Sequence, residues 1–347
     1  MFELVDISLA FQGNLPIVDY IRYAKIMEQY DFDSFFVFDD ICFYRSCWPI
    51  LFAVAPHTKK LRIGPSATHP FLRHPASIAN DIACLDELTQ GRAVLGMCRG
   101  DASVYEQLAT EVRRPLTCVK EAVEIVSRFI RGDMTAFNGD VFHVAEGLTF
   151  RYKTMRRAIP IFIGTWGPKL AQIAGSIKEV SEVRIDTLWN PSYIPKISEA
   201  IAHGAKEAGR DPSELRIAIG PQTSISKDRE AARKYAKEIL PEYLSYPPYS
   251  VMGTAIGINP EEIRAVTEAV LKKDYTREDK YTHAQYLISD RTIDNMAAVG
   301  TPEDIINGAK RMIRAGVTHI SFCHPHGPNI EEAIHLIGRE VIPHLKN

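Results

Sequence analysis

The chain has 347 residues, of which 46% are hydrophobic and 24% are charged, and its formal net charge is −2. This balance is typical of a globular protein with a large core, and it argues against nucleic acid or an anionic membrane surface as a partner. The sequence has no signal-peptide pattern and no apolar run approaching about eighteen residues, so we expect a cytoplasmic protein without a membrane span.

Short β-branched or aromatic runs alternate along the chain with longer segments of helical periodicity, which is the pattern of repeated βαβ units. We predict eight strands, at Phe2–Leu9, Ser34–Asp39, Leu61–Ser66, Arg92–Met97, Ile159–Gly164, Val180–Thr187, Leu215–Ser224 and Val317–Cys323. Eight strands that alternate with helices favour an α/β fold of the (β/α)8 TIM-barrel type. No composition shift or linker divides the chain, so residues 1–347 are predicted to form a single barrel domain with insertions.

Several helices between the strands carry clear boundary signals. One begins after Pro16, and another follows Pro115 and ends at Gly132. Thr301-Pro302-Glu303-Asp304 combines a capping threonine, a proline at the first helical position and two acidic residues for the helix dipole. An apolar stripe from Ile330 to Leu345 predicts the last helix.

Two insertions interrupt the regular alternation. Met134–Tyr152 is predicted to form a small hairpin around Asn138-Gly139. A second long stretch, between the seventh and eighth predicted strands, contains the Pro- and Tyr-rich Tyr243–Tyr249 and the Gly-rich Gly253–Gly257. Loops of that length in a compact domain are usually binding loops, so we predict that Tyr243–Gly257 covers the site.

The active site of a (β/α)8 barrel lies at the carboxyl ends of its strands, so the predicted strands define the candidate site residues. These candidates are Asp6, Ser8 and Phe11 at the first strand, Asp39-Asp40 at the second, Gly64–His69 at the third, Cys98–Asp101 at the fourth, Gly164–Gly167 at the fifth, Asp186 and Trp189 at the sixth, and His324 at the eighth. The six cysteines form no CxxC pair, and His324-Pro325-His326 makes a poor chelate, so no metal site is predicted.

Three of these segments have both a chemical and a structural interpretation. Gly164-Thr165-Trp166-Gly167-Pro168 precedes a predicted helix and could bind a phosphate, or it could simply be a tight strand–helix turn. Asp6 and Asp101 could form an acid–base pair in the barrel mouth, or Arg99 could neutralise Asp101 as a structural ion pair. Gly64–Pro70 could be a kinked loop or a backbone wall against a planar ligand.

The segment Leu85-Asp86-Glu87-Leu88-Thr89-Gln90-Gly91-Arg92, which runs into Ala93–Gly96, resembles the signature of the bacterial-luciferase-like flavoprotein superfamily. The resemblance covers nearly the whole chain and is greatest to the deazaflavin branch, above all to the methylenetetrahydromethanopterin reductases. Further matching segments are Phe38-Asp39-Asp40, Ile63–Pro70, Arg99-Gly100-Asp101, Gly164–Pro168, Val299–Pro302 and the tail from Gly316 to Pro328. Asp40 departs from the pattern, because relatives usually carry a histidine there.

The resemblance implies a TIM-barrel oxidoreductase that holds coenzyme F420, or alternatively FMN, across the strand ends. It implies a non-prolyl cis peptide bond at Ser66-Ala67, a cofactor-phosphate turn at Gly164–Gly167, and catalytic carboxylates at Asp6 and Asp101. The predicted cofactor-binding residues are Asp39, Asp40, Ser66, Ala67, Thr68, Cys98, Gly164, Thr165, Trp166 and Gly167.

The reaction that the resemblance implies is hydride transfer between reduced deazaflavin and an electrophilic carbon of a small molecule, with 5,10-methylenetetrahydromethanopterin as the leading substrate. An FMN-dependent monooxygenase and a non-catalytic flavin-binding protein are the alternatives. Relatives are often dimers or tetramers, so a homodimer or homotetramer is expected.

Overall fold

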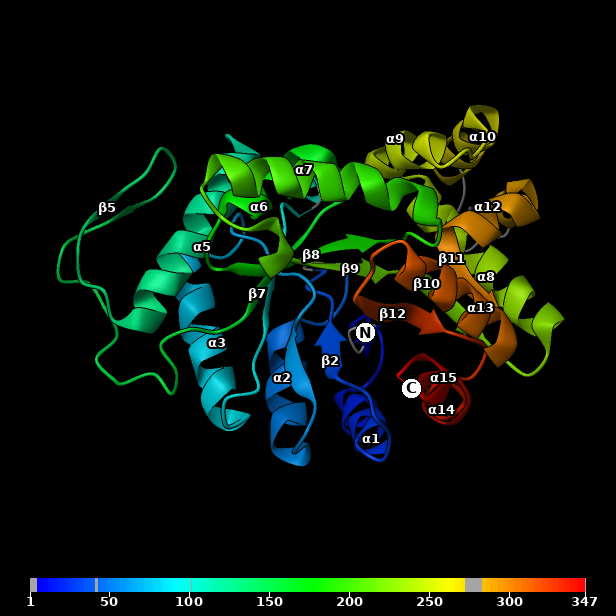
Figure 1. Ribbon diagram of the computed structural model, residues 1–347, viewed down its shortest axis with the longest axis horizontal. Coiled ribbons are helices and arrows are strands. Elements are labelled where there is room, and N and C mark those ends of the chain that lie inside the picture. The colour runs from blue at the N-terminus through cyan, green and yellow to red at the C-terminus, as the bar shows by residue number, and fades with distance from the viewer. Residues whose placement is uncertain (1–4, 41–42, 101, 272–282, 347) are drawn as a thin grey trace.

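The computed structural model describes residues 5–40, 43–100, 102–271 and 283–346. Within them, parallel strands form a ring in the order β3, β2, β1, β12, β9, β8, β7, β4 (Figure 1). The strands are β1 Asp6–Phe11, β2 Ser34–Val37, β3 Arg62–Pro65, β4 Leu95–Met97, β7 Ile161–Gly164, β8 Val180–Asp186, β9 Arg216–Gly220 and β12 His319–His326.

Backbone hydrogen bonds between the β3 and β4 segments close this ring. The amide of Val94 donates to the carbonyl of Ile63 at 3.0 Å, and the amide of Cys98 donates to the carbonyl of Thr68 at 2.9 Å. Parallel pairing at the last open edge leaves the ring without an exposed strand. The predicted (β/α)8 barrel is therefore confirmed.

The segment predicted as the seventh strand differs from the prediction, because Leu215–Ser224 is interrupted at Pro221. It forms β9 and β10 Gln222–Ile225, which pair with successive parts of β12. Proline has no amide hydrogen and cannot continue a ladder within a sheet. A further short strand, β11 Ala297–Gly300, pairs with β10 and was not predicted.

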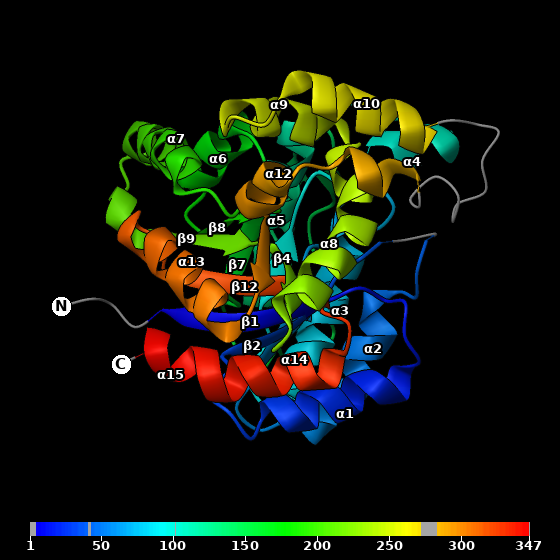
Figure 2. The same cartoon turned by 90° about the vertical axis from the view of Figure 1, so that its right-hand side faces the viewer.

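Helices surround the ring (Figure 2). Several begin with a proline at or next to the first helical position, where its missing amide hydrogen costs nothing. The α-helices are α1 Ile17–Met27, α2 Cys47–Val54, α3 Pro75–Leu88, α4 Ala102–Gln107, α5 Pro115–Arg131, α6 Pro168–Ser176, α7 Ile194–Glu207, α8 Arg229–Leu244, α9 Pro247–Ala255, α10 Pro260–Leu271, α12 Asp290–Met296, α13 Pro302–Arg314, α14 Ile330–Leu336 and α15 Ile342–Leu345. None of the helices in the described part of the chain has the length and apolarity needed to cross a membrane.

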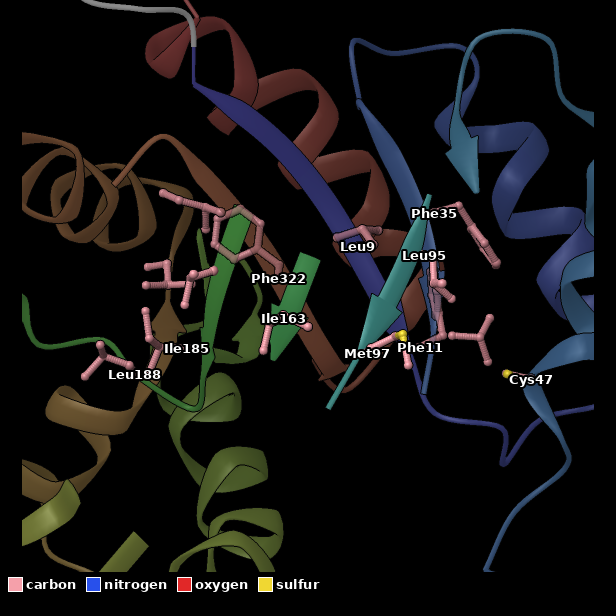
Figure 3. Close-up of a cluster of buried hydrophobic side chains, with 14 of the residues drawn as sticks. Leu9, Phe11, Phe35, Cys47, Leu95, Met97, Ile163, Ile185, Leu188 and Phe322 are labelled. Atoms are coloured by element: carbon pink, nitrogen blue, oxygen red, sulfur yellow. The ribbon is translucent and has the colours of Figure 1, made fainter. Parts of the chain in front are cut away.

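The apolar core lies between the ring and the helices. Leu9, Phe35, Ile163 and Phe322 are fully buried side chains from four strands of the ring (Figure 3). Side chains alternate along each strand, so the intervening residues point into the barrel. Burying one such apolar side chain contributes about 1.5–3 kcal/mol, so this layer dominates the stability of the fold.

Both insertions contain helices or strands within their described residues. Strands β5 Phe137–Asn138 and β6 His143–Val144 pair antiparallel, so the predicted hairpin is confirmed, and Figure 1 shows it projecting from the barrel. The segment Tyr243–Gly257 was predicted as a loop and is instead the end of α8 followed by α9. Proline at the start of α9 initiates a helix in a composition that we interpreted as irregular.

Candidate functional site

A pocket of about 860 Å³ opens at the carboxyl ends of the barrel strands. Of the predicted cofactor-binding residues, Asp39, Asp40, Ser66, Ala67, Cys98, Gly164, Thr165, Trp166 and Gly167 line it. They come from four separate places in the sequence, and the ring brings them together because parallel strands end at one edge. The structure therefore places these predicted residues around one pocket, and their role in binding a cofactor stays a prediction.

The floor of the pocket is formed where β3, β4 and β7 end. The Ser66–Ala67 peptide bond is cis, as the family resemblance implies. A Cβ atom added at Gly164 would lie 3.6 Å from the Cβ of Cys98 and 3.8 Å from the Cβ of Ala67. Because the side chains here are short or absent, a flat ring system can approach the backbone closely at the floor of the pocket.

A buried cation lies beneath this floor, and sequence reasoning missed it. Arg184, on β8, is fully buried, and its guanidinium lies 4.4 Å from the ring centre of Phe36 and 3.9 Å from that of Phe162. It donates hydrogen bonds to the Ser66 hydroxyl and to Glu182, each at 3.0 Å. The charge is therefore balanced by Glu182 and held between two aromatic faces directly under Ser66.

Glu182 links this cation to side chains of β12 and β1 inside the barrel. Its other oxygen contacts Nδ1 of His319 at 2.8 Å, and Nε2 of His319 contacts the Ser8 hydroxyl at 2.8 Å. Burial opposes ionisation of Glu182, but His319 and Arg184 together hold the pKa of its carboxyl below the ordinary value. The signal was present in the sequence, because Glu182, Arg184 and Asp186 alternate along one predicted strand and therefore share its inward face.

Asp186 is the last residue of β8 and lines the pocket. Its Oδ1 atom is buried and has no hydrogen-bond partner in the described part of the chain. Burial raises the pKa of this carboxyl to about 6, against the opposing effect of Arg184. A carboxyl with a raised pKa in a pocket is a candidate for acid–base chemistry.

Asp39 and Thr68 have different positions in the site. Asp39 lines the pocket, and its Oδ2 atom accepts a hydrogen bond from the Thr68 hydroxyl at 2.7 Å and another from Arg73 at 3.4 Å. Thr68 is fully buried and does not line the pocket, which corrects its predicted contact with the cofactor. Its hydroxyl instead orients the carboxylate of Asp39.

The turn from Gly164 to Gly167 forms one wall of the pocket and leads directly into α6. The Thr165 hydroxyl accepts a hydrogen bond from the amide of Gly167 at 3.1 Å, and Tyr193 donates to the carbonyl of Trp166 at 2.9 Å. A Cβ atom added at Gly167 would meet nothing within 4 Å, so there is open space beside this turn. The helix N-terminus and that space suit an anion, and phosphate binding here stays a prediction.

Of the two predicted catalytic carboxylates, Asp6 does not line the pocket. Asp6 begins β1 and lies at the opposite end of the barrel, where it pairs with Arg62 and Arg216, each at 2.6 Å. The predicted orientation of Asp6 towards the mouth is wrong, because the strand runs from Asp6 to Phe11 and ends later than Leu9. Asp101 lies outside the described residues.

Aromatic side chains from α8 and the turn after it cover the pocket, and sequence reasoning predicted this cover as a loop. Tyr243, Tyr246 and Val251 line the pocket from this side. His69, which follows β3, and Tyr105, which lies on α4, also line the pocket, with ring centres 5.4 Å apart. The cover makes the pocket aromatic and partly enclosed, which suits a planar organic ligand.

Known proteins resemble this chain over its full length. Residues 8–319 match the family described as luciferase-like monooxygenase. The 5,10-methylenetetrahydromethanopterin reductase of Methanolobus tindarius is 30% identical over 335 residues, which cover 96% of this chain and 99% of that protein. The F420-dependent glucose-6-phosphate dehydrogenase of Nakamurella multipartita is 23% identical over 93% of this chain and 91% of its own length.

The solved structures agree with the sequence comparison. The coenzyme F420-dependent tetrahydromethanopterin reductase from Methanopyrus kandleri superposes with a TM-score of 0.88 at 26% identity, covering 99% of this chain and 100% of the other. The superposition shows that this chain shares its barrel fold with that enzyme. The chain belongs to the luciferase-like monooxygenase family.

Proposed function

We propose that this protein is a coenzyme F420-dependent oxidoreductase that transfers a hydride between the deazaflavin and 5,10-methylenetetrahydromethanopterin. The observation that carries the proposal is the similarity to methylenetetrahydromethanopterin reductases over the full length of both chains, which includes every segment of the pocket. The pyrimidine ring of such a pterin is flat and has polar edges, which suits an aromatic pocket with carboxyl groups.

The residues present fit the cofactor. The low floor at Ala67 and Gly164 leaves room for a flat ring, and the open space beside Gly167 leaves room for a phosphate. Lys169 and Lys196 also line the pocket and would attract an anionic tail. When bound, the deazaflavin would supply the hydride.

The chain's own residues would position the reactants and exclude water. Arg184 donates a hydrogen bond to the Ser66 hydroxyl and so would fix the position of the pocket floor against which the ring would lie. Tyr243 and Tyr246 would cover the substrate from the outer side. Holding the two reacting carbons in contact accounts for much of the rate in a reaction of this kind.

The binding experiment separates the proposed cofactor from its alternative. Purified apoprotein would be titrated with coenzyme F420 and, separately, with FMN, and binding would be followed by visible absorbance and fluorescence. We expect tight binding of F420 and weak binding of FMN. Tight FMN binding without F420 binding would instead favour a flavin monooxygenase.

The turnover experiment tests the reaction. Reduced F420 would be mixed with 5,10-methylenetetrahydromethanopterin, and in a parallel reaction oxidised F420 would be mixed with glucose 6-phosphate, while the absorbance of oxidised F420 is recorded. We expect oxidation of F420 with the pterin. Binding of F420 without turnover of either substrate would indicate a non-catalytic binding protein.

The quaternary structure is part of the same proposal. Relatives in the luciferase-like superfamily are often dimers or tetramers, and we propose a homodimer or a homotetramer for this chain. Light scattering coupled to gel filtration measures the molar mass directly, and the mass of one 39.0 kDa chain would contradict this part of the proposal.

A further inference from the structure

The pocket contains a carboxyl group with one buried oxygen that has no hydrogen-bond partner among the described residues. We propose that Asp186 is the acid–base residue of this pocket and that it gives a proton to the substrate nitrogen when a carbon–nitrogen bond opens. This inference rests on the proposed function. When a hydride is transferred to a carbon that bridges two nitrogens, one nitrogen is released and needs a proton, and the inference names Asp186 as its source.

The backbone on either side of Asp186 is shaped around its carboxyl group. Asp186 is in register with Gly220 on β9, and a Cβ atom added at Gly220 would lie 2.0 Å from Oδ1 of Asp186 and 3.0 Å from Sγ of Cys323. Only glycine leaves this space free. The carboxyl therefore occupies a depression between β8, β9 and β12 at the pocket floor.

The Oδ1 atom of Asp186 is buried and has no hydrogen-bond partner within the described part of the chain. A buried polar atom without a partner costs about 1–3 kcal/mol, and a catalytic role is one of the reasons for which native proteins keep such an atom. Because this carboxyl lines the pocket, a ligand bound there can supply the missing partner.

Asp39 and Asp6 are less suited to this role. Asp39 lines the pocket and its Oδ1 is also buried without a hydrogen-bond partner among the described residues, but its Oδ2 already accepts hydrogen bonds from Thr68 and Arg73. Asp6 is paired with two arginines at the far end of the barrel. Asp186 combines a position in the pocket with a carboxyl that no cation contacts within hydrogen-bond distance among the described residues.

The charged and titratable groups around Asp186 leave its pKa within reach of neutral pH. Arg184 and Glu182 precede it on β8, Cys98 faces it from the end of β4, and Cys323 faces it from β12. The charge of Arg184 is shared with Glu182 at 3.0 Å, and burial raises the pKa of both thiols, so neither thiol competes as an anion. Burial then raises the pKa of Asp186 to about 6, which lets both protonation states exist near neutral pH.

The proton transfer balances the proposed reaction. The methylene carbon of the substrate bridges two nitrogens, and it receives the hydride with its two electrons. One carbon–nitrogen bond breaks, its electron pair stays on the nitrogen, and that nitrogen takes the proton from Asp186. Oxidation of the cofactor releases one hydride and one proton, so the carboxylate is reprotonated without net uptake of a proton from solvent.

The kinetic test compares Asp186→Asn with a matched control, Asp81→Asn. Burial also raises the pKa of Asp81, but this residue lies on α3 and does not line the pocket. We expect Asp186→Asn to lower kcat by about 10²-fold or more while leaving the Kd for F420 within about threefold, since general acids contribute about 10²–10⁴-fold. The ionisation near pH 6 in the kcat profile should disappear in Asp186→Asn and persist in Asp81→Asn.

A second measurement needs no turnover. Infrared difference spectra of the ligand-free protein, taken between acidic and alkaline pH, report the carbonyl band of a protonated carboxyl group. We expect a band that titrates near pH 6, is lost in Asp186→Asn, is retained in Asp81→Asn and is shifted in Gly220→Ala. If Asp186→Asn does not fold, the wild-type protein and Gly220→Ala still give this test.

Two results would overturn the inference. One is a kcat of Asp186→Asn within about threefold of the wild type with the acidic ionisation intact. The other is an infrared spectrum without a titrating band, or with a band that Asp186→Asn retains. If the wild-type protein binds no F420, the proposed function fails and this catalytic role fails with it, and the infrared titration shows separately whether Asp186 holds the proton.

Discussion

Arg184 is the residue whose burial most needs compensation. Its guanidinium is fully buried, and it pairs with Glu182, contacts Ser66 and lies against the rings of Phe36 and Phe162. Removing one partner of a buried ion pair leaves the other charge uncompensated, which costs more than losing the attraction of a surface pair.

Arg184→Met is therefore expected to lower the free energy of unfolding by about 3–5 kcal/mol, because the carboxylate of Glu182 loses its cation. Arg131→Met, which removes a surface pair with Glu179, should cost at most about 1 kcal/mol. Urea denaturation of both variants gives the comparison, and equal losses would contradict the buried pair's importance. Adding Glu182→Gln to Arg184→Met should restore part of the stability.

His326 makes the protein sensitive to acid. It is fully buried, neither ring nitrogen has a hydrogen-bond partner in the described residues, and burial places its pKa well below the ordinary value. In the unfolded chain, the His326 imidazole therefore binds a proton below about pH 6.5, whereas in the folded protein it stays neutral. The free energy of unfolding should fall as pH drops below that value.

The test compares the urea midpoint at about pH 7.5 and about pH 5 in three proteins. His326→Gln should lose less stability on acidification than the wild type, by on the order of 1–2 kcal/mol, since one pKa unit corresponds to about 1.4 kcal/mol. His57→Gln, at an exposed position, should behave like the wild type. A wild-type stability that is constant or rises over this range would contradict the argument.

At the scale of elements, the hairpin of β5 and β6 depends on one side chain of α5. The carboxylate of Glu121 accepts hydrogen bonds from the backbone amides of Asp140 at 2.6 Å, Val141 at 3.0 Å and Phe142 at 2.9 Å. These three bonds hold the turn of the hairpin against the helix, although the hairpin itself contains only short strands.

Glu121→Ala should release this turn, because three amide donors lose their acceptor together. Hydrogen exchange measured by mass spectrometry should become clearly faster in the peptide that covers residues 137–144, while exchange in the barrel strands stays unchanged. Glu124→Ala, on the same helix, removes a half-buried pair with Arg128 but no acceptor of the hairpin amides, and should leave that peptide unchanged. Unchanged exchange in Glu121→Ala would show that the hairpin is held by other contacts.

At the scale of the whole molecule, the pocket draws residues from most of the barrel strands, so a ligand there should stabilise the entire fold. F420 at about 100 times its Kd should raise the free energy of unfolding by about 2.7 kcal/mol, because it binds the folded state alone. Differential scanning fluorimetry with F420, and with FMN at the same concentration as the control, measures the shift. A Tm that rises equally with both would contradict the proposed preference for F420.

The sequence predicted the location of the pocket well because strand ends and turn residues are local features. Cys98 and Gly164–Gly167 follow short β-branched strands, and a parallel barrel gathers such ends at one rim. The predicted orientation of Asp6 was wrong because the predicted limits of its strand were displaced by a few residues. Each residue advances the chain by about 3.3 Å along a strand, so a small error in the limits changes which end of the barrel a side chain occupies. The predicted cofactor contact of Thr68 was wrong because its burial behind Asp39 depends on how neighbouring strands pack, which local sequence does not determine.

The sequence by itself determined the repeated βαβ pattern, the helix starts, the hairpin and the set of residues at the strand ends, since periodicity and turn chemistry act over a few neighbours. Only the tertiary structure decided which carboxyl faces the pocket, how Arg184 is neutralised inside the barrel, and that α9 covers the site. Those outcomes depend on contacts between residues far apart in the chain, where burial and charge compensation are set by the closed ring as a whole.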